Sequence, residues 1–442
     1  MSLDAAGRSA CATVLAAALL CAQGLPPEVI ALTRIRDGVR RTFEQLPDCT
    51  CVETVNRYLK PAGKSMQAMD RMVLETLFTG DEELFASPGD AHWNTDPATF
   101  IASGLIGNGL FASHLKSVFL NNVSITRYHG EESAGGRRES RYDFSISQNL
   151  SGYQVHSYNV TRIVATEGSF WADPETHELR RLEFHAVEMP PELMYLDLFT
   201  AITYGHVRVG ERDILLPQTA VLEATDIEGG VKRDLIEFTH CRGFQTESTL
   251  HFEDEPVPPP SRGPALFSSK ADQALPAGLR LTITLAGPLS DQTAVGSLIE
   301  GKIVGAVMQK GKVLVPDGAT VKGRVRRLEH YADSGDGLIG EYYAVGLEFM
   351  RIELPAASLR FYAAMQDVDR AEGIQMSTFG GSREKRTEMK AGPTSMIQIE
   401  TRHDSITAPD VPGVGTFFVR RPHFFLPAGF KLVWKTEAFP GQ

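Results

Sequence analysis

Beyond its first 24 residues, the chain has no apolar run long enough to cross a bilayer, so the sequence predicts no transmembrane span in the mature protein. It also lacks an excess of positive charge, since 44 Lys and Arg stand against 55 Asp and Glu and the formal net charge is −11. A nucleic-acid-binding protein needs a basic face to displace counterions from phosphates, so this charge argues against a nucleic-acid partner. It also disfavours adhesion to anionic lipid by charge alone.

Recognisable catalytic signatures are missing as well: the chain has no G-x-S-x-G, H-E-x-x-H, P-loop or EF-hand pattern. GDGLIG (335–340) fits G-x-G-x-x-G, but a strand-like segment follows it, so we interpret it as a hairpin turn. SREK (382–385) and SYN (157–159) imitate two motifs of penicillin-binding enzymes, in reversed order and without Lys-Thr-Gly. The sequence therefore predicts no catalytic residues, no cofactor and no enzyme activity, with an unrecognised hydrolase as the minor alternative.

The first 24 residues have the pattern of a secretory signal peptide. Arg8 is followed by the apolar stretch ACATVLAAALLCA, and cleavage is expected after Gly24. We therefore predict an exported protein, periplasmic or otherwise associated with the cell envelope. Two alternatives stay open: a buried N-terminal helix, and a lipoprotein acylated at Cys21, against which the large Leu20 argues.

Cysteine is scarce, and Cys11 and Cys21 would leave with the signal peptide. In an oxidising compartment the remaining three make a disulfide feasible, and Cys49 and Cys51 are too close along an extended segment to bridge each other easily. We predict Cys51–Cys241, with Cys49–Cys241 second and three unpaired thiols as the alternative. The bridge is expected to stabilise the fold by ~4 kcal/mol in the chain-entropy model. A structural zinc site requires four ligands, which the three remaining cysteines do not supply, so no metal site is predicted.

The organisation predicted for the mature chain is two mainly β domains, since 442 residues exceed one ordinary core. Residues 25–252 start with an amphipathic helix (28–46) and continue as antiparallel strands and hairpins, one of them turning at Asp173-Pro174-Glu175-Thr176. Within them, FIASGLIGNGLFASHL (100–115) is interpreted as helix broken by glycines. Residues 253–273 are rich in Pro and Ser and are predicted to be a linker. Residues 274–442 are predicted to form a small β-barrel or sandwich.

A short phrase recurs in the second domain. LPAG begins at Leu275 and again at Leu426, and the looser VPDG begins at Val315. Proline fixes φ at the second position of a tight turn, and glycine accepts a positive φ at its end. Alternating residues follow, so each phrase predicts a turn that leads into a strand. Three such corners favour a barrel or sandwich, and the irregular spacing argues against a solenoid.

Aromatic residues are the remaining candidates for a functional site. Six of them in the first domain lie on segments that could face one concavity, which would form an apolar pocket for an acyl chain or a similar ligand. The alternative is that they belong to an ordinary core. The six residues are Trp93, Phe100, Phe111, Phe170, Trp171 and Phe184.

The second domain resembles the C-terminal β-barrel of the type IV (conjugation) secretion scaffold subunit. That family starts its barrel with a phrase like LPAGLRLTITLAGPLSDQ, continues with one like GKVLVPDGATVKGRV, and ends near one like FFLPAGFKLVWKTE; all three stand here in that order. The family's membrane anchor and its apolar pore-forming hairpin have no counterpart, because the corresponding stretch, MQDVDRAEGIQMSTFGGSREKRTEMK, is polar. The resemblance therefore implies the barrel and not the pore.

The first domain is similar in layout to the periplasmic lipoprotein-carrier fold, in which a helix precedes an open antiparallel half-barrel around an apolar cavity. The similarity rests on the helix, the strand series and the hairpin FWADPETHELRRLEF. We therefore predict a non-enzymatic envelope protein that binds a lipid or acyl-chain ligand in the first domain and docks to an envelope protein partner through the second. The competing hypothesis is a structural or assembly protein of an envelope or secretion complex without a small ligand.

Overall fold

The structure is a computed structural model, in which most of the chain is described. The described residues are 25–80, 82–157, 160–244, 272–332, 341–355, 357–370, 373–376, 396–400 and 413–439. The predicted signal peptide, nearly all of the predicted linker and the GDGLIG and SREK matches lie outside them. No helix of the described segments combines the length and the apolar character needed to cross a bilayer.

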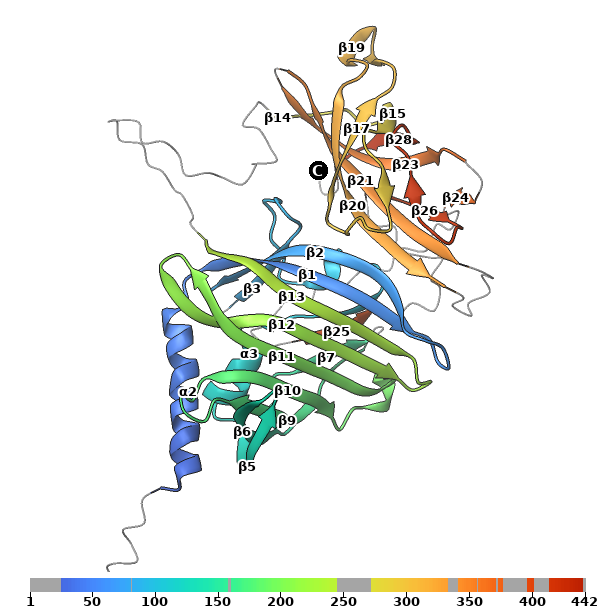
Figure 1. Ribbon diagram of the computed structural model, residues 1–442. Coiled ribbons are helices and arrows are strands. Elements are labelled where there is room, and N and C mark those ends of the chain that lie inside the picture. Colours follow the sequence, from blue (N-terminus) through green and yellow to red (C-terminus); the bar gives the residue numbers. More distant parts are fainter. Residues whose placement is uncertain are drawn as a thin grey trace, which may run out of the picture.

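The first sheet has ten strands in the order β3-β2-β1-β13-β12-β11-β10-β9-β6-β5, and neighbouring strands are antiparallel. It curls into an open half-barrel (Figure 1). This confirms the predicted mainly β fold with an antiparallel half-barrel. The strands are β1 (Cys49–Lys60), β2 (Gln67–Thr79), β3 (Glu82–Ala86), β5 (Ile125–Ala134), β6 (Arg137–Ile146), β9 (Ala165–Ala172), β10 (Leu179–Val187), β11 (Tyr195–Val209), β12 (Arg212–Asp226) and β13 (Val231–Gly243).

Alternation along the strands determines which side chains face the inside of the half-barrel. In β13, Asp234, Ile236 and Phe238 are buried while Leu235 between them is exposed, because successive side chains of a strand point to opposite faces. The predicted hairpin between β9 and β10 is confirmed: Asp173 Oδ1 accepts hydrogen bonds from the backbone N–H groups of Glu175 and Thr176, both at 2.9 Å.

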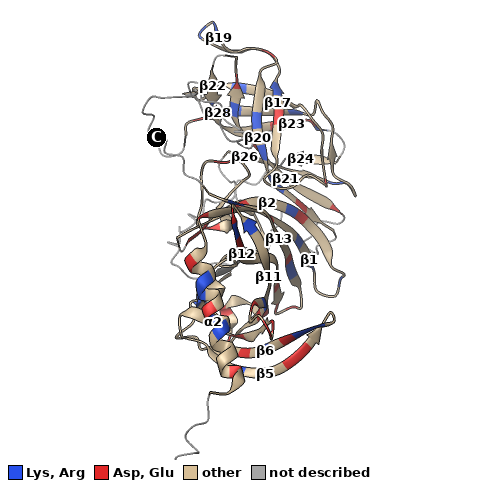
Figure 2. Ribbon diagram, turned by 60° about the vertical axis from the view of Figure 1, so that its left-hand side comes forward, with Lys and Arg blue, Asp and Glu red and all other residues tan. Residues whose placement is uncertain are grey.

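The predicted N-terminal helix is confirmed as α2 (Pro27–Gln45), with proline in its first turn and Ile35 and Val39 buried. It runs beside the turns at one rim of the half-barrel: Arg212, the first residue of β12, donates to the carbonyl oxygen of Gln45 at 2.7 Å. Its outer side carries charged residues of both signs (Figure 2), as expected of a solvated face.

A smaller layer lies inside the curve of the half-barrel. It is a four-stranded sheet in the order β4-β25-β7-β8, accompanied by a short helix and a π-helical turn that follow β4 in the chain. β4 packs against β12 and β13. Residues 100–115 are therefore not a broken helix: the glycine-bounded GLIG forms a strand within them. The elements are β4 (Gly104–Gly107), α3 (Ser113–Leu115), η2 (Lys116–Leu120), β7 (Gln154–Ser157), β8 (Val160–Ile163) and β25 (Met396–Glu400).

The second domain contains a sheet in the order β14-β22-β21-β20-β17-β15-β28-β23, and β26 pairs with β21 and β24 beside this path. Trp434 and Phe349 meet edge to face in its core at 5.8 Å between ring centroids. The strands are β14 (Asp272–Ala274), β15 (Arg280–Leu285), β17 (Leu298–Ile303), β20 (Thr320–Tyr331), β21 (Tyr342–Glu353), β22 (Ser358–Arg360), β23 (Tyr362–Val368), β24 (Ile374–Met376), β26 (Val414–Val419) and β28 (Lys431–Glu437), with the pairs β16 (Leu289–Ser290) with β27 (Phe425–Leu426) and β18 (Val307–Gln309) with β19 (Lys312–Val315).

The two LPAG phrases are corners, and they pair with each other. Gly278 and Gly429 have φ of 90° and 85°, the left-handed region that favours glycine. The strands that follow, β15 and β28, are antiparallel neighbours. The N–H of Gly278 donates to the carbonyl oxygen of Thr436 and the N–H of Gly429 to that of Leu285, both at 2.8 Å. The first corner is thus bonded to the end of β28, the strand that follows the second corner. The second corner is bonded to the end of β15, the strand that follows the first.

A segment of the second domain pairs with the part of β2 that β3 does not reach. The N–H of Val73 in β2 donates to the carbonyl oxygen of Val295 at 2.9 Å, and the N–H of Val295 donates to that of Arg71 at 2.8 Å. Because buried backbone groups are costly to leave unpaired, this short bridge fixes the register between the two domains.

The predicted disulfide is confirmed: Cys51 of β1 is bonded to Cys241 of β13, 190 residues away in sequence. The two strands are neighbours, and their pairing register shifts between Thr50 and Val52, at the bridged Cys51. Cys49 is an unpaired, buried thiol, and burial raises its pKa to about 11.

Candidate ligand-binding site

Aromatic rings from the large sheet meet rings of the inner layer inside the half-barrel. Phe170 of β9 stacks on Tyr142 of β6 with ring centroids 5.1 Å apart, and Phe119 of η2 meets Phe170 edge-on at 4.7 Å. Phe184 of β10 lies 4.8 Å from the ring of His114 in α3. All five side chains are buried. The large sheet and the inner layer are therefore joined here by apolar and aromatic contacts.

Four of the six aromatic residues predicted to line a concavity lie on this side of the sheet or at its end. Phe170 and Phe184 face the inner layer, and Phe111 meets Phe238 of β13 edge-on at 4.9 Å. Phe100 is half-buried where the two domains meet, with the guanidinium carbon of Arg326 6.0 Å from its ring centroid.

The two tryptophans lie elsewhere. Trp171 follows Phe170 in β9 and so points to the outer face of the sheet, where the guanidinium carbon of Arg181 lies 3.9 Å from its ring centroid. Its indole N–H donates to Glu132 at 3.0 Å. Trp93 is half-buried in a loop against Phe244, with ring centroids 6.2 Å apart. The structure thus does not bring Trp171 or Trp93 to the concave face.

The space left between the aromatic rings is small. A narrow void of about 20 Å³ lies among His114, Phe144, Tyr153 and Phe184. A void of this size holds about one water molecule and no acyl chain. At this place the described side chains therefore fill the space between the two layers, and a larger ligand bound there requires the inner layer to move.

His114 adds no charge to this interior. Burial lowers its pKa to about 3, and the backbone hydrogen bond at Asn108 offsets only part of that effect. The ring is consequently neutral at physiological pH, which suits an apolar neighbourhood and argues against a role as a general base near pH 7.

The interior becomes polar where the second domain meets it. Arg57 of β1 makes a two-pronged ion pair with Asp70 of β2, at 2.7 and 2.5 Å, and lies 3.6 Å from Glu329 of β20. Glu329 also accepts from Arg327 Nε at 2.6 Å and from Ser103 Oγ at 3.1 Å. Burial alone would raise the pKa of Glu329, but the guanidinium groups of Arg327 and Arg57 outweigh it and hold the pKa low.

Two buried carboxyl groups, of Glu53 and Asp234, and one half-buried, of Glu83, lie near this network. Burial raises the pKa of Glu53 to about 7, although Thr76 donates a hydrogen bond to it. Burial also raises the pKa of Asp234 well above its usual range, against the attraction of Arg57. Glu83 accepts from the backbone N–H groups of 109, 111 and 112 and so anchors the loop that leads into α3.

Sequence reasoning missed these charged residues, and a signal for them exists. In CVETVNRYL, Glu53 and Arg57 alternate with Cys51 and Val55 on the inward-facing positions of β1. A charged residue in the apolar phase of a strand needs a partner when buried. That pattern points to an interior ion pair, but Asp70 and Glu329 could not be named from it.

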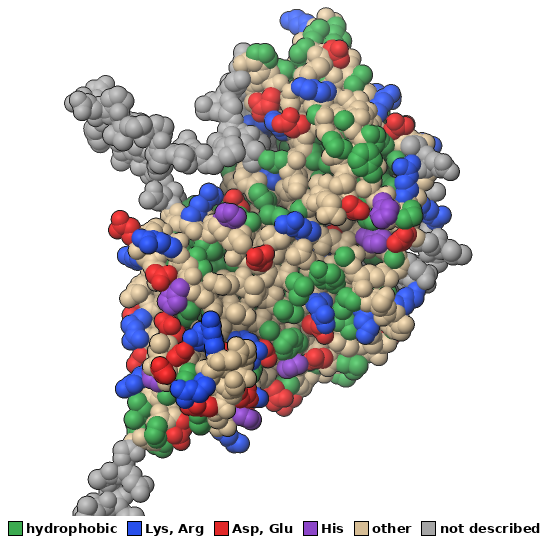
Figure 3. All heavy atoms as spheres, in the orientation of Figure 1, with side chains coloured by type: hydrophobic (Ala, Val, Ile, Leu, Met, Phe, Trp, Pro, Cys, Tyr) green, Lys and Arg blue, Asp and Glu red, His purple; other side chains and the backbone are tan. Residues whose placement is uncertain are grey.

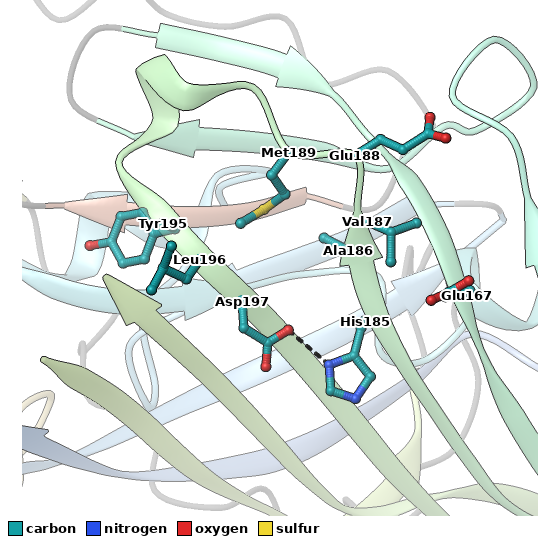
Figure 4. Close-up of a pocket in the computed structure, with 9 residues that line it drawn as sticks. All are labelled: Glu167, His185, Ala186, Val187, Glu188, Met189, Tyr195, Leu196 and Asp197. Carbon is teal, nitrogen blue, oxygen red and sulfur yellow. Dashed lines mark hydrogen bonds and ion pairs between the residues drawn. The ribbon is translucent and has the colours of Figure 1, made fainter. Parts of the chain in front are cut away.

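A second, open pocket of about 500 Å³ lies on the outer side, where β10 and β11 separate beyond His185 and Phe199 (Figure 4). His185 Nδ1 lies 2.8 Å from Asp197 Oδ1, and both side chains are about half exposed. Glu167, Met189 and Tyr195 also line the pocket. Its lining contains no serine, threonine or cysteine that the histidine–aspartate pair could activate. Among the described residues no cluster of His, Cys, Asp and Glu suits a metal ion.

The rim of the half-barrel near this pocket carries exposed apolar side chains. They come from the starts of β5 and β11, the end of β8 and the neighbouring turns. The face of the molecule seen in Figure 3 intersperses both signs of charge and has no continuous basic patch. The rim residues are Ile125, Leu150, Ile163, Met194, Leu196 and Ile227.

No model of a known protein family matches the chain. No curated protein sequence matches it either. Three solved structures are similar to it in fold. One is a domain from Vibrio parahaemolyticus assigned to outer membrane lipoprotein sorting, at 15% identity and a TM-score of 0.28, over 49% of this chain and 93% of that chain.

The second is a LolA superfamily protein from Nitrosomonas europaea, at 10% identity and a TM-score of 0.25, over 48% of this chain and 93% of that one. The third is a DUF1329 family protein from Desulfovibrio piger, at 14% identity and a TM-score of 0.27, over 49% of this chain and 95% of that one. At these identities and TM-scores, neither a ligand nor a partner can be transferred to this chain. The mainly β, half-barrel fold rests on the sheet itself.

Proposed function

We propose that the first domain binds a hydrophobic ligand, a lipid or another acyl chain, between the concave face of the large sheet and the inner layer. We further propose that the protein is an exported, non-enzymatic carrier of the cell envelope. The observation that carries the proposal is the aromatic contact between the two layers, formed by Phe119, Phe170 and Phe184 with His114 neutral beside them. Such contacts are non-directional, so an acyl chain that displaces the inner-layer rings would restore apolar contact with the sheet.

The exposed apolar rim supports a route for such a ligand. Leu196 and Met194 are 65% and 41% exposed at the start of β11, beside the end of the interior that α2 leaves open. Exposed apolar side chains gathered at one rim favour contact with a hydrophobic partner. The second domain, residues 274–442, is proposed to dock to an envelope protein, in keeping with its resemblance to a secretion-scaffold barrel.

The test is native mass spectrometry of the protein expressed with its signal peptide and purified without detergent. A co-purifying lipid is expected, together with binding of a fluorescent sixteen-carbon fatty-acid probe. Phe184→Asp, which places a charge in the apolar interior, should weaken probe binding at least tenfold. Trp171→Leu changes an equally buried aromatic residue on the opposite face and should leave binding unchanged. Absence of lipid together with failure to bind the probe would refute the proposal.

A second candidate function has its own supporting observation. The void among the described rings is about 20 Å³, so these rings pack against one another as they would in a core. This favours a structural or assembly protein that uses both domains for protein contacts and binds no small ligand. Under that function Phe184→Asp destabilises the fold, and the wild-type protein binds no acyl probe.

A further inference from the structure

The inner sheet of the first domain is completed by a strand from far along the chain. β25 lies between β4, with which it is antiparallel, and β7, with which it is parallel. Both neighbours belong to the first domain, whereas β25 follows β24 of the second domain in sequence. Figure 1 shows β25 and β7 within the curve of the large sheet. We call the space between β4 and β7 the strand slot.

The strand slot has the dimensions of one polypeptide strand. Neighbouring strands lie about 4.8 Å apart, so removal of β25 would leave the backbones of β4 and β7 about 10 Å apart. The facing N–H and C=O groups of both strands would then lack the partners that β25 supplies. Unpaired buried backbone groups are costly, and an acyl chain offers no hydrogen bonds to satisfy them. An extended polypeptide does, from both of its edges.

The register indicates which sequences fit. Ile397 lies opposite Gly107 and Val155, and Ile399 lies opposite Leu105 and Ser157. The slot residues at these positions are buried and apolar or small. Strand addition obtains affinity from main-chain hydrogen bonds and specificity from alternate side-chain positions. The slot therefore favours an extended segment with apolar residues at two alternate positions.

Between those positions, Gln398 lies opposite Ile106 and His156. His156 is half-buried, and its Nδ1 lies 2.9 Å from the hydroxyl oxygen of Thr161 in β8. The middle position thus has one buried apolar neighbour, Ile106, and one polar neighbour, His156, and β25 itself carries glutamine there, which gives the pattern apolar-polar-apolar.

We propose that the strand slot between β4 and β7 is a binding site for an extended polypeptide of this pattern, and that β25 is its resident occupant. A segment of the same chain competes with an effective concentration on the order of millimolar, so a second polypeptide binds only when β25 is displaced. The site differs from the acyl-chain site proposed above, because it uses backbone hydrogen bonds and not aromatic contacts.

The test uses the full-length protein and a fluorescein-labelled peptide with the sequence of residues 394–402, TSMIQIETR. Ile397→Asp with Ile399→Asp is designed to vacate the slot. The matched control is Met308→Asp with Val313→Asp, two half-exposed residues of the β18–β19 hairpin. The peptide should bind the vacated variant at least tenfold more tightly than it binds the wild type or the control. A peptide carrying Asp at both isoleucine positions should not bind.

Hydrogen exchange supplies a second readout. The amides of 105–107 and 155–157 should lose protection in the vacated variant and regain it when the peptide is added. Equal peptide binding by the wild type and the vacated variant would overturn the proposal, as would protection that the peptide fails to restore. Restoration by the fatty-acid probe and not by the peptide would assign the slot to a lipid and also overturn it.

A cysteine pair keeps the proposal testable if the double aspartate variant does not fold. Ile106→Cys and Gln398→Cys occupy positions that face each other across β4 and β25. Oxidation should lock β25 in place and weaken peptide binding at least tenfold relative to the reduced protein, while binding of the fatty-acid probe serves as an independent check on the other site. Unchanged peptide binding on oxidation would refute the assignment of the slot.

Discussion

The guanidinium group of Arg57 in the first domain lies 3.6 Å from the carboxylate of Glu329 in the second, and both side chains are at most 3% exposed. Arg57 is also bonded to Asp70, and Glu329 to Arg327, so two ion pairs meet across the domain boundary. Buried charges of this kind are tolerated only while every partner is in place. The network therefore ties the orientation of the second domain to the interior of the first.

Substitution of one residue of this buried ion-pair network should destabilise the fold. Glu329→Gln leaves Arg327 without its carboxylate and is expected to lower the free energy of unfolding by about 3–5 kcal/mol, as for other broken buried pairs. Urea denaturation measures the change. Glu192→Gln is the matched control, because it breaks the ion pair of Glu192 with Arg162, two side chains that are 45% exposed, and it should leave the free energy of unfolding nearly unchanged. Equal effects of the two substitutions would contradict a buried network.

Glu53 predicts a specific pH dependence. Its pKa in the folded protein, about 7, lies above the ordinary value of 4.5 in the unfolded chain. The folded state therefore binds the proton more tightly, and stability falls as pH rises from 4.5 to 7. This window corresponds to a loss of about 3 kcal/mol at 1.4 kcal/mol per pKa unit.

The measurement compares wild type with Glu53→Gln, which keeps the shape of a protonated carboxyl group. Other buried acids titrate in both proteins, so the difference between the two unfolding free energies isolates Glu53. We expect the free energy of unfolding of Glu53→Gln to rise relative to that of the wild type by up to about 3 kcal/mol between pH 5 and pH 8. A difference that stays constant over this range would show that Glu53 is already ionised in the folded protein.

The disulfide gives a third prediction. Non-reducing peptide mapping of denatured protein should find the peptides of Cys51 and Cys241 joined and Cys49 free to alkylate. In the folded protein Cys49 should resist alkylation at pH 8, because burial raises its pKa to about 11. Cys51→Ser with Cys241→Ser should lower the free energy of unfolding by about 2–5 kcal/mol. Reduction that leaves stability unchanged would contradict this estimate.

Local turn chemistry and strand alternation were sufficient to predict much of the fold. The helix 28–46, the hairpin at Asp173 and the LPAG corners each follow from residues adjacent in sequence, and all are confirmed. These features depend on the covalent geometry of a few neighbouring residues, so the sequence suffices to predict them. The Cys51–Cys241 bridge is different, because excluding a Cys49–Cys51 bond still left Cys49–Cys241 and three unpaired thiols open, and the structure was needed to decide between them.

The candidate ligand-binding site could not be predicted in the same way, because it is formed by contacts that no local sequence pattern specifies. Phe170 and Trp171 are adjacent aromatic residues, and only the pleat of β9 sends one inward and the other outward between two arginines. The sequence could not place Glu329 beside Arg57 or β25 beside β4, because each contact joins segments hundreds of residues apart. Long-range pairing of this kind is set by the packing of whole sheets.

The paired LPAG corners predict matched effects at two distant glycines. Gly278 and Gly429 both have positive φ, and a Cβ added at either would meet no atom within 4 Å, so only backbone strain opposes alanine there. Gly278→Ala and Gly429→Ala should each lower the free energy of unfolding by about 1 kcal/mol or more. Gly287 has equally open surroundings without a positive φ, so Gly287→Ala should be neutral or slightly stabilising.

Because the amides of Gly278 and Gly429 bond to opposite ends of one β15–β28 pair, the double variant should deviate from additivity in urea denaturation. Full additivity would show that the two corners act independently.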